Sequence, residues 1–159
     1  MSTGFLRRCV VASDHAAVEA RRQVESLLRE QGLEVLSFGP ANADERTDYP
    51  EVAYDACAAV LMGEADGGFL LCGSGIGMSI AANRFVPIRA ALCRSIEDAR
   101  MARLHNDANI CCLGARSTDR ADIEAIVSAF LTGAFEGGRH TKRVTMLGNV
   151  PHARGSHGA

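Results

Sequence analysis

Short apolar runs that alternate with helix-length segments constrain the fold of this chain more than any other feature. Five largely apolar runs of strand length are continuous and do not alternate regularly with polar residues: 9–12, 33–38, 68–72, 88–93 and 109–113. Such runs are typical of strands covered on both faces. Between them, residues 17–31, 52–63 and 123–131 keep apolar side chains at helical spacing. The alternation predicts a doubly wound α/β fold, in which about five parallel strands form a sheet between two layers of helices.

Length and charge narrow the class of protein further. A chain of 159 residues fits one domain, and we expect residues 1–150 to form it, ending in a helix, with a flexible tail at 151–159. A net charge of −2, with both signs mixed along the chain, indicates no nucleic-acid partner. No stretch is apolar enough for a signal sequence or a membrane span, so we expect a cytoplasmic protein without a membrane partner.

The cysteines and histidines indicate neither disulfides nor a metal site. None of the six cysteines has C-x-x-C spacing and several lie within apolar runs, so we expect reduced thiols. Five of them we interpret as packing residues: Cys9, Cys57, Cys93, Cys111 and Cys112. The five histidines are too dispersed to predict a zinc site. We therefore expect no metal and no cofactor.

Sheets of this class bind ligands beyond the carboxyl ends of their strands. Chemically capable residues follow three of the predicted strands: Asp14-His15 after the first, Cys72-Gly73-Ser74 after the third, and Arg116 shortly after the fifth. Asp14 has a second interpretation, as a cap of the helix that follows it. The sequence thus places a candidate site at this edge of the sheet.

The stretch CGSGIGMSIAAN, residues 72–83, joins an apolar strand to an Ala-rich helix. Gly73, Gly75 and Gly77 let the backbone approach a ligand, and the free N–H groups of the helix favour an anion or a developing oxyanion there. A dinucleotide fingerprint is incomplete, because Met78 stands in place of its third glycine. A P-loop is excluded, because no Lys-Ser or Lys-Thr pair follows the glycines.

Several candidate residues have both a chemical and a structural interpretation. A thiol near a helix N-terminus gives up its proton readily, so Cys72 can act as a general base or a nucleophile, or it can be a small core residue. His105, at the end of a helix expected over 95–104, can do chemistry or complement the helix dipole. Arg139 and Arg143, spaced i and i+4, can clamp a phosphate or form a solvated basic turn.

Six stretches, in order and at natural spacing over residues 8–147, resemble one family. They are Ser13-Asp14-His15-Ala16, Asp48-Tyr49-Pro50, residues 72–83, Arg89-Ala90-Ala91-Leu92, HNDANICCLG at 105–114, and Arg139-His140-x-x-Arg143. They resemble ribose-5-phosphate isomerase B and the galactose-6-phosphate isomerase subunits. The resemblance implies a metal-free aldose–ketose isomerase of a phosphorylated sugar, with D-ribose 5-phosphate favoured. It also implies a Rossmann-like homodimer, or a tetramer, with its sites at the subunit interface.

The resemblance further implies roles for individual residues. Cys72 is expected to be the base that moves a proton between C1 and C2 through a cis-enediolate. The Ser74 hydroxyl and the N–H groups of Gly73, Gly75 and Gly77 would hold the enediolate oxygen. His105, with Asp14, would open the furanose ring. The implied substrate contacts are Asn106 and Tyr49 for the sugar, and His15, Arg116, Arg139 and Arg143 for the phosphate.

The identity of the sugar stays open at this point. Residues 84–88, Arg-Phe-Val-Pro-Ile, depart from the family's usual Lys-Val-Pro-Gly-Val in a loop that leads towards the site. Allose 6-phosphate, galactose 6-phosphate and a tetrose 4-phosphate are alternatives. Two other interpretations are a nucleotide-binding module with a structural Cys72, and an isomerase subunit that needs a partner subunit. Cys72 together with Met78, in place of a carboxylate, favours the branch of the family that uses a thiol.

Overall fold

A fully parallel, five-stranded sheet forms the centre of the molecule, in the order β2-β1-β3-β5-β4. The computed structural model describes residues 5–151, so the predicted tail lies outside the described residues except for Pro151. The strands are β1 (Arg8–Ser13), β2 (Glu34–Phe38), β3 (Gly67–Cys72), β4 (Ala90–Leu92) and β5 (Ile110–Gly114). From β1 the chain moves outward to β2 and then back past β1 to β3. The topological switch point, where such sheets bind ligands, therefore lies between the ends of β1 and β3.

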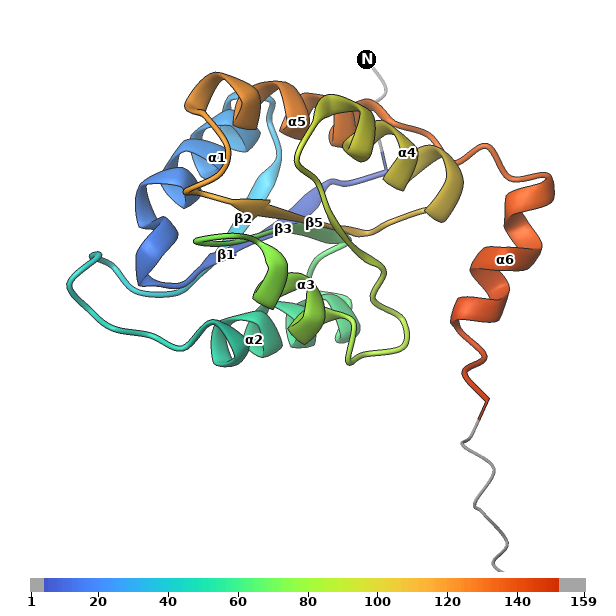
Figure 1. Ribbon diagram of the computed structural model, residues 1–159, viewed down its shortest axis with the longest axis horizontal. Coiled ribbons are helices and arrows are strands. Elements are labelled where there is room, and N and C mark those ends of the chain that lie inside the picture. Colours follow the sequence, from blue (N-terminus) through green and yellow to red (C-terminus); the bar gives the residue numbers. More distant parts are fainter. Residues whose placement is uncertain (1–4, 152–159) are drawn as a thin grey trace, which may run out of the picture.

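Helices cover both faces of this sheet, which gives the three layers visible in Figure 1. On one face lie α1 (Val18–Glu30), α4 (Ile96–Asn106) and α5 (Arg120–Thr132), and on the other α2 (Tyr49–Leu61) and α3 (Ile76–Ala82). A short 3-10 helix, His15–Ala17, precedes α1. The predicted doubly wound fold is confirmed. Within residues 5–151, no helix combines the length and apolar character that a bilayer span requires.

The burial of the strands explains their unbroken apolar runs. Along the central strands, alternate side chains enter two separate core clusters: Val11 and Phe69 face α1, α4 and α5, whereas Val10 and Leu70 face α2 and α3. All six cysteines are buried and free, and the five other than Cys72 were expected to be packing residues. The expected strand over 88–93 is shorter, because the N–H of Ile88 bonds to the Phe85 carbonyl in a turn before β4 begins.

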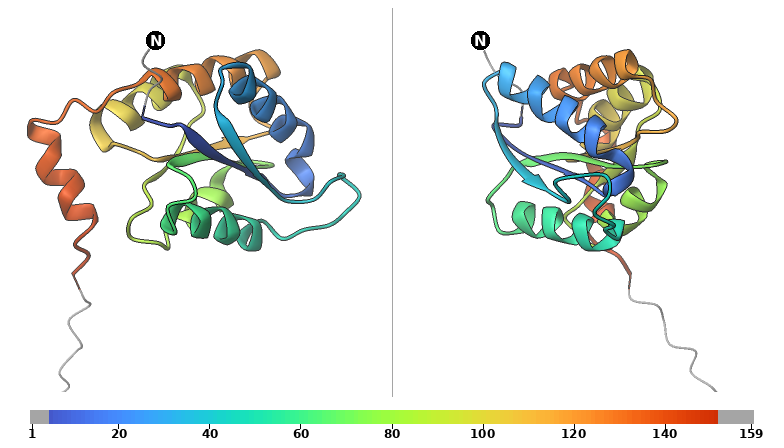
Figure 2. Two further views of the ribbon diagram at one scale, coloured as in Figure 1. Left: turned by 180° about the vertical axis from the view of Figure 1, so that it is seen from behind. Right: turned by 90° about the vertical axis from the view of Figure 1, so that its left-hand side faces the viewer.

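α6 (Arg139–Leu147) stands apart from the three layers, as Figures 1 and 2 show from opposite sides. Gly137 and Gly138, with left-handed φ values of 67° and 55°, turn the chain into this helix, which packs against α4. Met146 and Leu147 at its end are 62% and 50% exposed. The apolar side of α6 is therefore left uncovered by its own chain.

Candidate active site

Cys72 is the last residue of β3, and the turn after it points a backbone N–H at its sulfur. The N–H of Gly75 donates to Cys72 Sγ at 3.1 Å, and α3 begins at the next residue. Gly75 has a left-handed φ of 75°, and a Cβ there would lie 2.7 Å from the Leu92 side chain, so glycine is required. The thiol itself is 5% exposed. A negative charge on this sulfur would strengthen the hydrogen bond that it accepts from the Gly75 N–H.

The loop after β5 is joined to this turn by two backbone hydrogen bonds. Ala115 N–H donates to the Cys72 carbonyl at 2.9 Å, and Arg116 N–H donates to the Gly73 carbonyl at 3.0 Å. The exposed Arg116 guanidinium lies over Gly73, where a Cβ would approach its Nη1 to 3.0 Å. The exposed Ser74 accepts the Ile76 N–H on its Oγ at 3.3 Å. A cationic and a hydroxyl group therefore lie beside the thiol.

Asp14 follows β1, on the other side of the switch point from Cys72. Its Oδ1 accepts the Ala16 N–H at 3.0 Å, which confirms the predicted helix cap. Burial raises the pKa of the Asp14 carboxyl, although the Ala16 hydrogen bond and the charges of His15 and Arg116 act in the opposite direction. The influence of Arg116 on Asp14 shows that the ends of β1 and β5 share one electrostatic environment.

His15 and Tyr49 complete this group from the α2 side. His15 Nδ1 lies 3.1 Å from the Thr47 carbonyl and 3.3 Å from its N–H, in the loop before α2. The Tyr49 ring covers Gly77, where a Cβ would lie 2.6 Å from its Cζ. The structure thus brings together one set of predicted residues, here called the strand-end cluster: Asp14, His15, Tyr49, residues 72–77 and Arg116.

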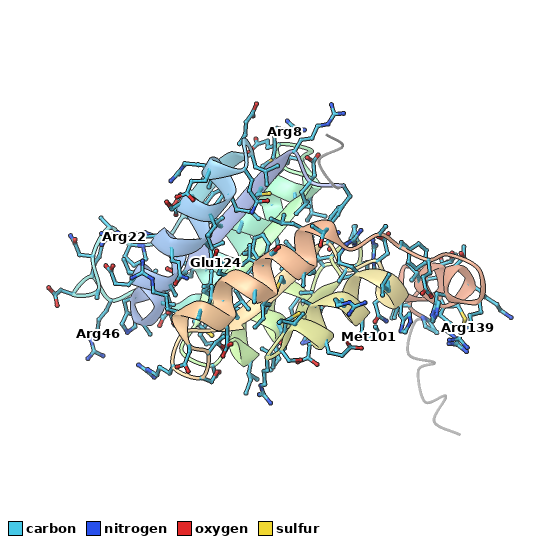
Figure 3. All side chains as sticks on the ribbon, turned by 90° about the horizontal axis from the view of Figure 1, so that it is seen from above. Arg8, Arg22, Arg46, Met101, Glu124 and Arg139 are labelled. Carbon is cyan, nitrogen blue, oxygen red and sulfur yellow. The ribbon has the colours of Figure 1, made fainter. Side chains whose placement is uncertain are left out.

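The remaining predicted residues lie at the opposite end of the sheet. α4 ends at Asn106, just before β5 starts at Ile110, and Ile110 pairs with Gly68 at the start of β3, not with its end. At ~3.3 Å per residue, the four steps from Ile110 to Gly114 separate the two ends by about 13 Å. Figure 3 shows Arg139 on α6 at one end of the molecule, and Arg46, next to Thr47, at the other. His105, Asn106, Arg139 and Arg143 therefore do not join the strand-end cluster within a single chain.

These residues form a second group, here called the helix-end cluster: His105, Asn106, Glu136, Arg139, His140 and Arg143. The rings of His105 and His140 stack with centroids 4.2 Å apart and planes 11° apart. Each Nε2 lies 3.7 Å from the same Glu136 oxygen. The Nε–H of Arg139 donates to His140 Nε2 at 3.3 Å. Sequence analysis assigned no role to Glu136 or His140, although His140 stands inside the quoted Arg-His-x-x-Arg motif.

Two imidazoles and a carboxylate are the ligand types of a transition-metal site, and their nearest ligand atoms lie within 4.8 Å of one another. The stacking of the rings opposes this interpretation. A coordinated imidazole nitrogen bonds in the plane of its ring, whereas a cation between two parallel rings would lie outside both planes. The geometry fits stacking and hydrogen bonding better than metal ligation.

Asp107 ends α4 and fixes the position of the helix-end cluster. It is the C-cap, with a left-handed φ of 45° that is unusual for a residue other than glycine. Its carboxylate pairs with the buried Arg103 at 2.9 Å and with Arg89 at 3.0 Å. The helix therefore continues past the expected end at residue 104 and carries His105 and Asn106 in its last turn.

Comparisons with known proteins show which family the chain matches. Residues 9–147 match the model of the family described as Ribose/Galactose Isomerase. The chain is 38% identical to ribose-5-phosphate isomerase B of Escherichia coli, over 94% of this chain and 99% of that protein. It is 36% identical to D-erythrulose-4-phosphate isomerase of Pectobacterium atrosepticum, over 89% and 93%.

Solved structures extend the similarity to the fold. A ribose 5-phosphate isomerase from Thermotoga maritima superposes with a TM-score of 0.86 at 45% identity, covering 90% of this chain and 98% of that one. The type B enzyme from Trypanosoma brucei gives 0.86 at 43% identity, covering 90% and 97%. The chain therefore belongs to the Ribose/Galactose Isomerase family.

Proposed function

We propose that this protein is an aldose–ketose isomerase of phosphorylated sugars, with D-ribose 5-phosphate and D-ribulose 5-phosphate as its favoured pair. The family and the names of its relatives support the reaction class. The observation that carries the chemistry is the Gly75 N–H bond to Cys72 Sγ at the switch point of the sheet. A thiol base requires a reducing compartment, so we propose that the enzyme works in the cytoplasm.

Cys72 acts as the base of this proposed reaction. The thiolate takes the proton from C2 of the open-chain aldose, and the electrons form the enediolate. The thiol then delivers the proton to C1 while the hydroxyl proton of O2 passes to O1, which leaves a ketone at C2 and restores the thiolate. The Ser74 hydroxyl and the N–H groups of Gly73 and Gly77 hold the oxygen that becomes negative, while the Gly75 N–H stays on Cys72 Sγ. No redox partner is needed, because the proton and the electron pair both stay within the substrate.

A second copy of the chain completes the site. Ring opening by His105, sugar contact by Asn106 and phosphate binding by Arg139 and Arg143 all require the helix-end cluster, which lies far from Cys72 in its own chain. A two-fold dimer brings each strand-end cluster against the partner's helix-end cluster and so forms two equivalent sites. The exposed apolar ends of α3 and α6, with Ile80 58% and Leu147 50% exposed, support such an interface.

Conversion of ribose 5-phosphate to ribulose 5-phosphate by the purified chain tests the reaction. Cys72→Ala is expected to lower kcat/KM by about 10³-fold, a loss of the size expected when a general base is removed. Cys57→Ala is the matched control, because it also removes a buried thiol, but from the middle of α2. Full activity of Cys72→Ala would remove the proposed base, whereas equal losses in both variants would point to folding.

One relative gives a specific reason to test a second substrate. The D-erythrulose-4-phosphate isomerase of Pectobacterium atrosepticum belongs to the same set of relatives. Parallel assays with ribose 5-phosphate, allose 6-phosphate, galactose 6-phosphate and erythrose 4-phosphate, compared by kcat/KM, decide between them. A higher value for any sugar other than ribose 5-phosphate reassigns the substrate while leaving the reaction class intact.

A further inference from the structure

His140 is a histidine of the helix-end cluster that the proposed reaction does not use. Its side chain is 7% exposed, whereas its helix neighbours Arg139 and Thr141 are exposed. The loop that precedes α6 holds it there, because the N–H of Glu136 donates to the Leu104 carbonyl of α4 at 3.0 Å. A buried polar side chain on a helix that otherwise lies in solvent is an unusual arrangement.

The contact with Arg139 determines the protonation of His140. A guanidinium Nε–H can only donate, so the His140 Nε2 that receives it presents a lone pair. The proton of the neutral ring is then on Nδ1. Burial lowers the pKa of His140, as do the nearby charges of His105, Arg139 and Arg143, while Glu136 acts in the opposite direction. The contact with Arg139 and the lowered pKa therefore both favour the neutral ring.

His140 also contacts His105, the proposed ring-opening residue. Its ring lies flat against His105 at 4.2 Å, and two positive imidazoles at this distance would repel each other. With His140 neutral, no second positive ring lies against His105, and the Glu136 carboxylate lies 3.7 Å from its Nε2. Because Arg139 donates to His140 through its Nε–H, its two Nη groups can bind a phosphate.

We propose that His140 is a positioning residue of the isomerase site, which holds the ring of His105 by stacking and orients the guanidinium of Arg139 through Nε2. The inference rests on the proposed function, in which His105 opens the sugar ring and Arg139 binds the phosphate. His140 thereby couples the group that handles protons to the group that anchors the substrate.

Two substitutions separate the two contacts. His140→Phe keeps a flat ring over His105 but removes the acceptor of Arg139, so we expect KM to rise about tenfold with little change in kcat. His140→Gln keeps an acceptor at the position of Nε2 but removes the stacking ring, so we expect kcat to fall about tenfold with little change in KM. Lys142→Ala, an exposed change on the same helix, is the control. The proposal would be overturned if both variants changed kcat by the same factor and KM by the same factor.

A measurement on the unmodified protein makes the inference independent of how the variants fold and of activity. Nitrogen NMR of ¹⁵N-histidine-labelled protein at pH 7 is expected to show His140 with a protonated Nδ1 and a bare Nε2. A protonated Nε2 would contradict the proposal. If the chain turns over no sugar phosphate, the proposed function fails and the tautomer alone decides on His140. If the chain is active but the two variants behave alike, the inference fails and the function stands.

Discussion

At the scale of single residues, Asp14 serves a structural and a chemical purpose that make opposite demands. Its Oδ1 caps the first helical turn, yet the carboxyl is 8% exposed, and burial raises its pKa above the ordinary 3.8. An acid whose pKa is raised by folding stabilises the fold only while it is protonated. This contribution is complete below the unfolded pKa and is lost as the pH rises through the folded pKa. At neutral pH, the ionised Asp14 therefore lowers the free energy of unfolding, although the proposed reaction requires this carboxylate.

Asp14→Asn is expected to keep the Ala16 hydrogen bond while removing the buried charge. We expect the free energy of unfolding to rise at pH 7 relative to the original protein, and the difference to vanish near pH 3, while kcat falls about 10²-fold. Urea unfolding at the two pH values and the isomerase assay measure both effects. Asp55→Asn, the same change at an exposed position of α2, is the control. A variant that is less stable at pH 7 than at pH 3, relative to the original protein, would show that the charge is well tolerated.

The position of a candidate site residue could be predicted where the neighbouring sequence determines it, and not where contacts with distant residues do. Asp14 and Cys72 follow apolar runs directly, so their placement at strand ends could be read from the sequence and is confirmed. The burial of His140 could not, because it depends on residues 133–138, which carry α6 back against α4 with little apolar patterning of their own. The roles of all these residues in the reaction stay predictions.

At the scale of elements, the end of α4 depends on partners distant in sequence. The helix expected over 95–104 is confirmed, but its end was placed two residues too early, at 104 instead of 106. Asp107 closes the helix in a left-handed conformation, held by Arg89 from the loop before β4 and by Arg103. Strand β4 was overestimated at its start for a related reason, since the N–H of Ile88 bonds to the Phe85 carbonyl in a turn before the strand begins. Apolar patterns thus locate elements, whereas hydrogen bonds between distant residues set their ends.

Asp107→Ala is expected to lower the free energy of unfolding by about 2 kcal/mol or more. The change removes both ion pairs and leaves the buried Arg103 with only backbone carbonyls as hydrogen-bond acceptors. It also puts alanine in a left-handed conformation, which costs about 1 kcal/mol. Asp107→Asn is the matched variant, because asparagine tolerates this conformation and still accepts hydrogen bonds, so a loss of about 1 kcal/mol or less is expected. Chemical denaturation of both proteins measures the difference. Equal losses would mean that the charge, and not the conformation, dominates.

At the scale of the whole molecule, the candidate site residues of one chain form two clusters at opposite ends of its sheet. The sequence motifs predict which residues belong to the site, but their order carries no information on which copy of the chain would supply them. That information depends on topology: α4 runs antiparallel to the strands, so its last turn lies at their amino ends. The separated clusters, together with the uncovered side of α6, favour a dimer in which each copy supplies half of each site.

Mixing two inactive variants tests this dimer directly. Cys72→Ala damages the strand-end cluster and His105→Ala damages the helix-end cluster. In a mixed dimer, one site carries both changes and the other carries neither, so a freely exchanged equal mixture is expected to recover about a quarter of the original activity. Isomerase assays after mixing, with chain exchange followed by native mass spectrometry, measure the recovery. A mixture of Cys72→Ala with Asp14→Asn is the control, because both changes lie in the strand-end cluster and every site keeps one defect. Recovery in the first mixture alone requires sites shared between chains, whereas no recovery despite confirmed exchange would mean that the helix-end cluster acts within its own chain or not at all.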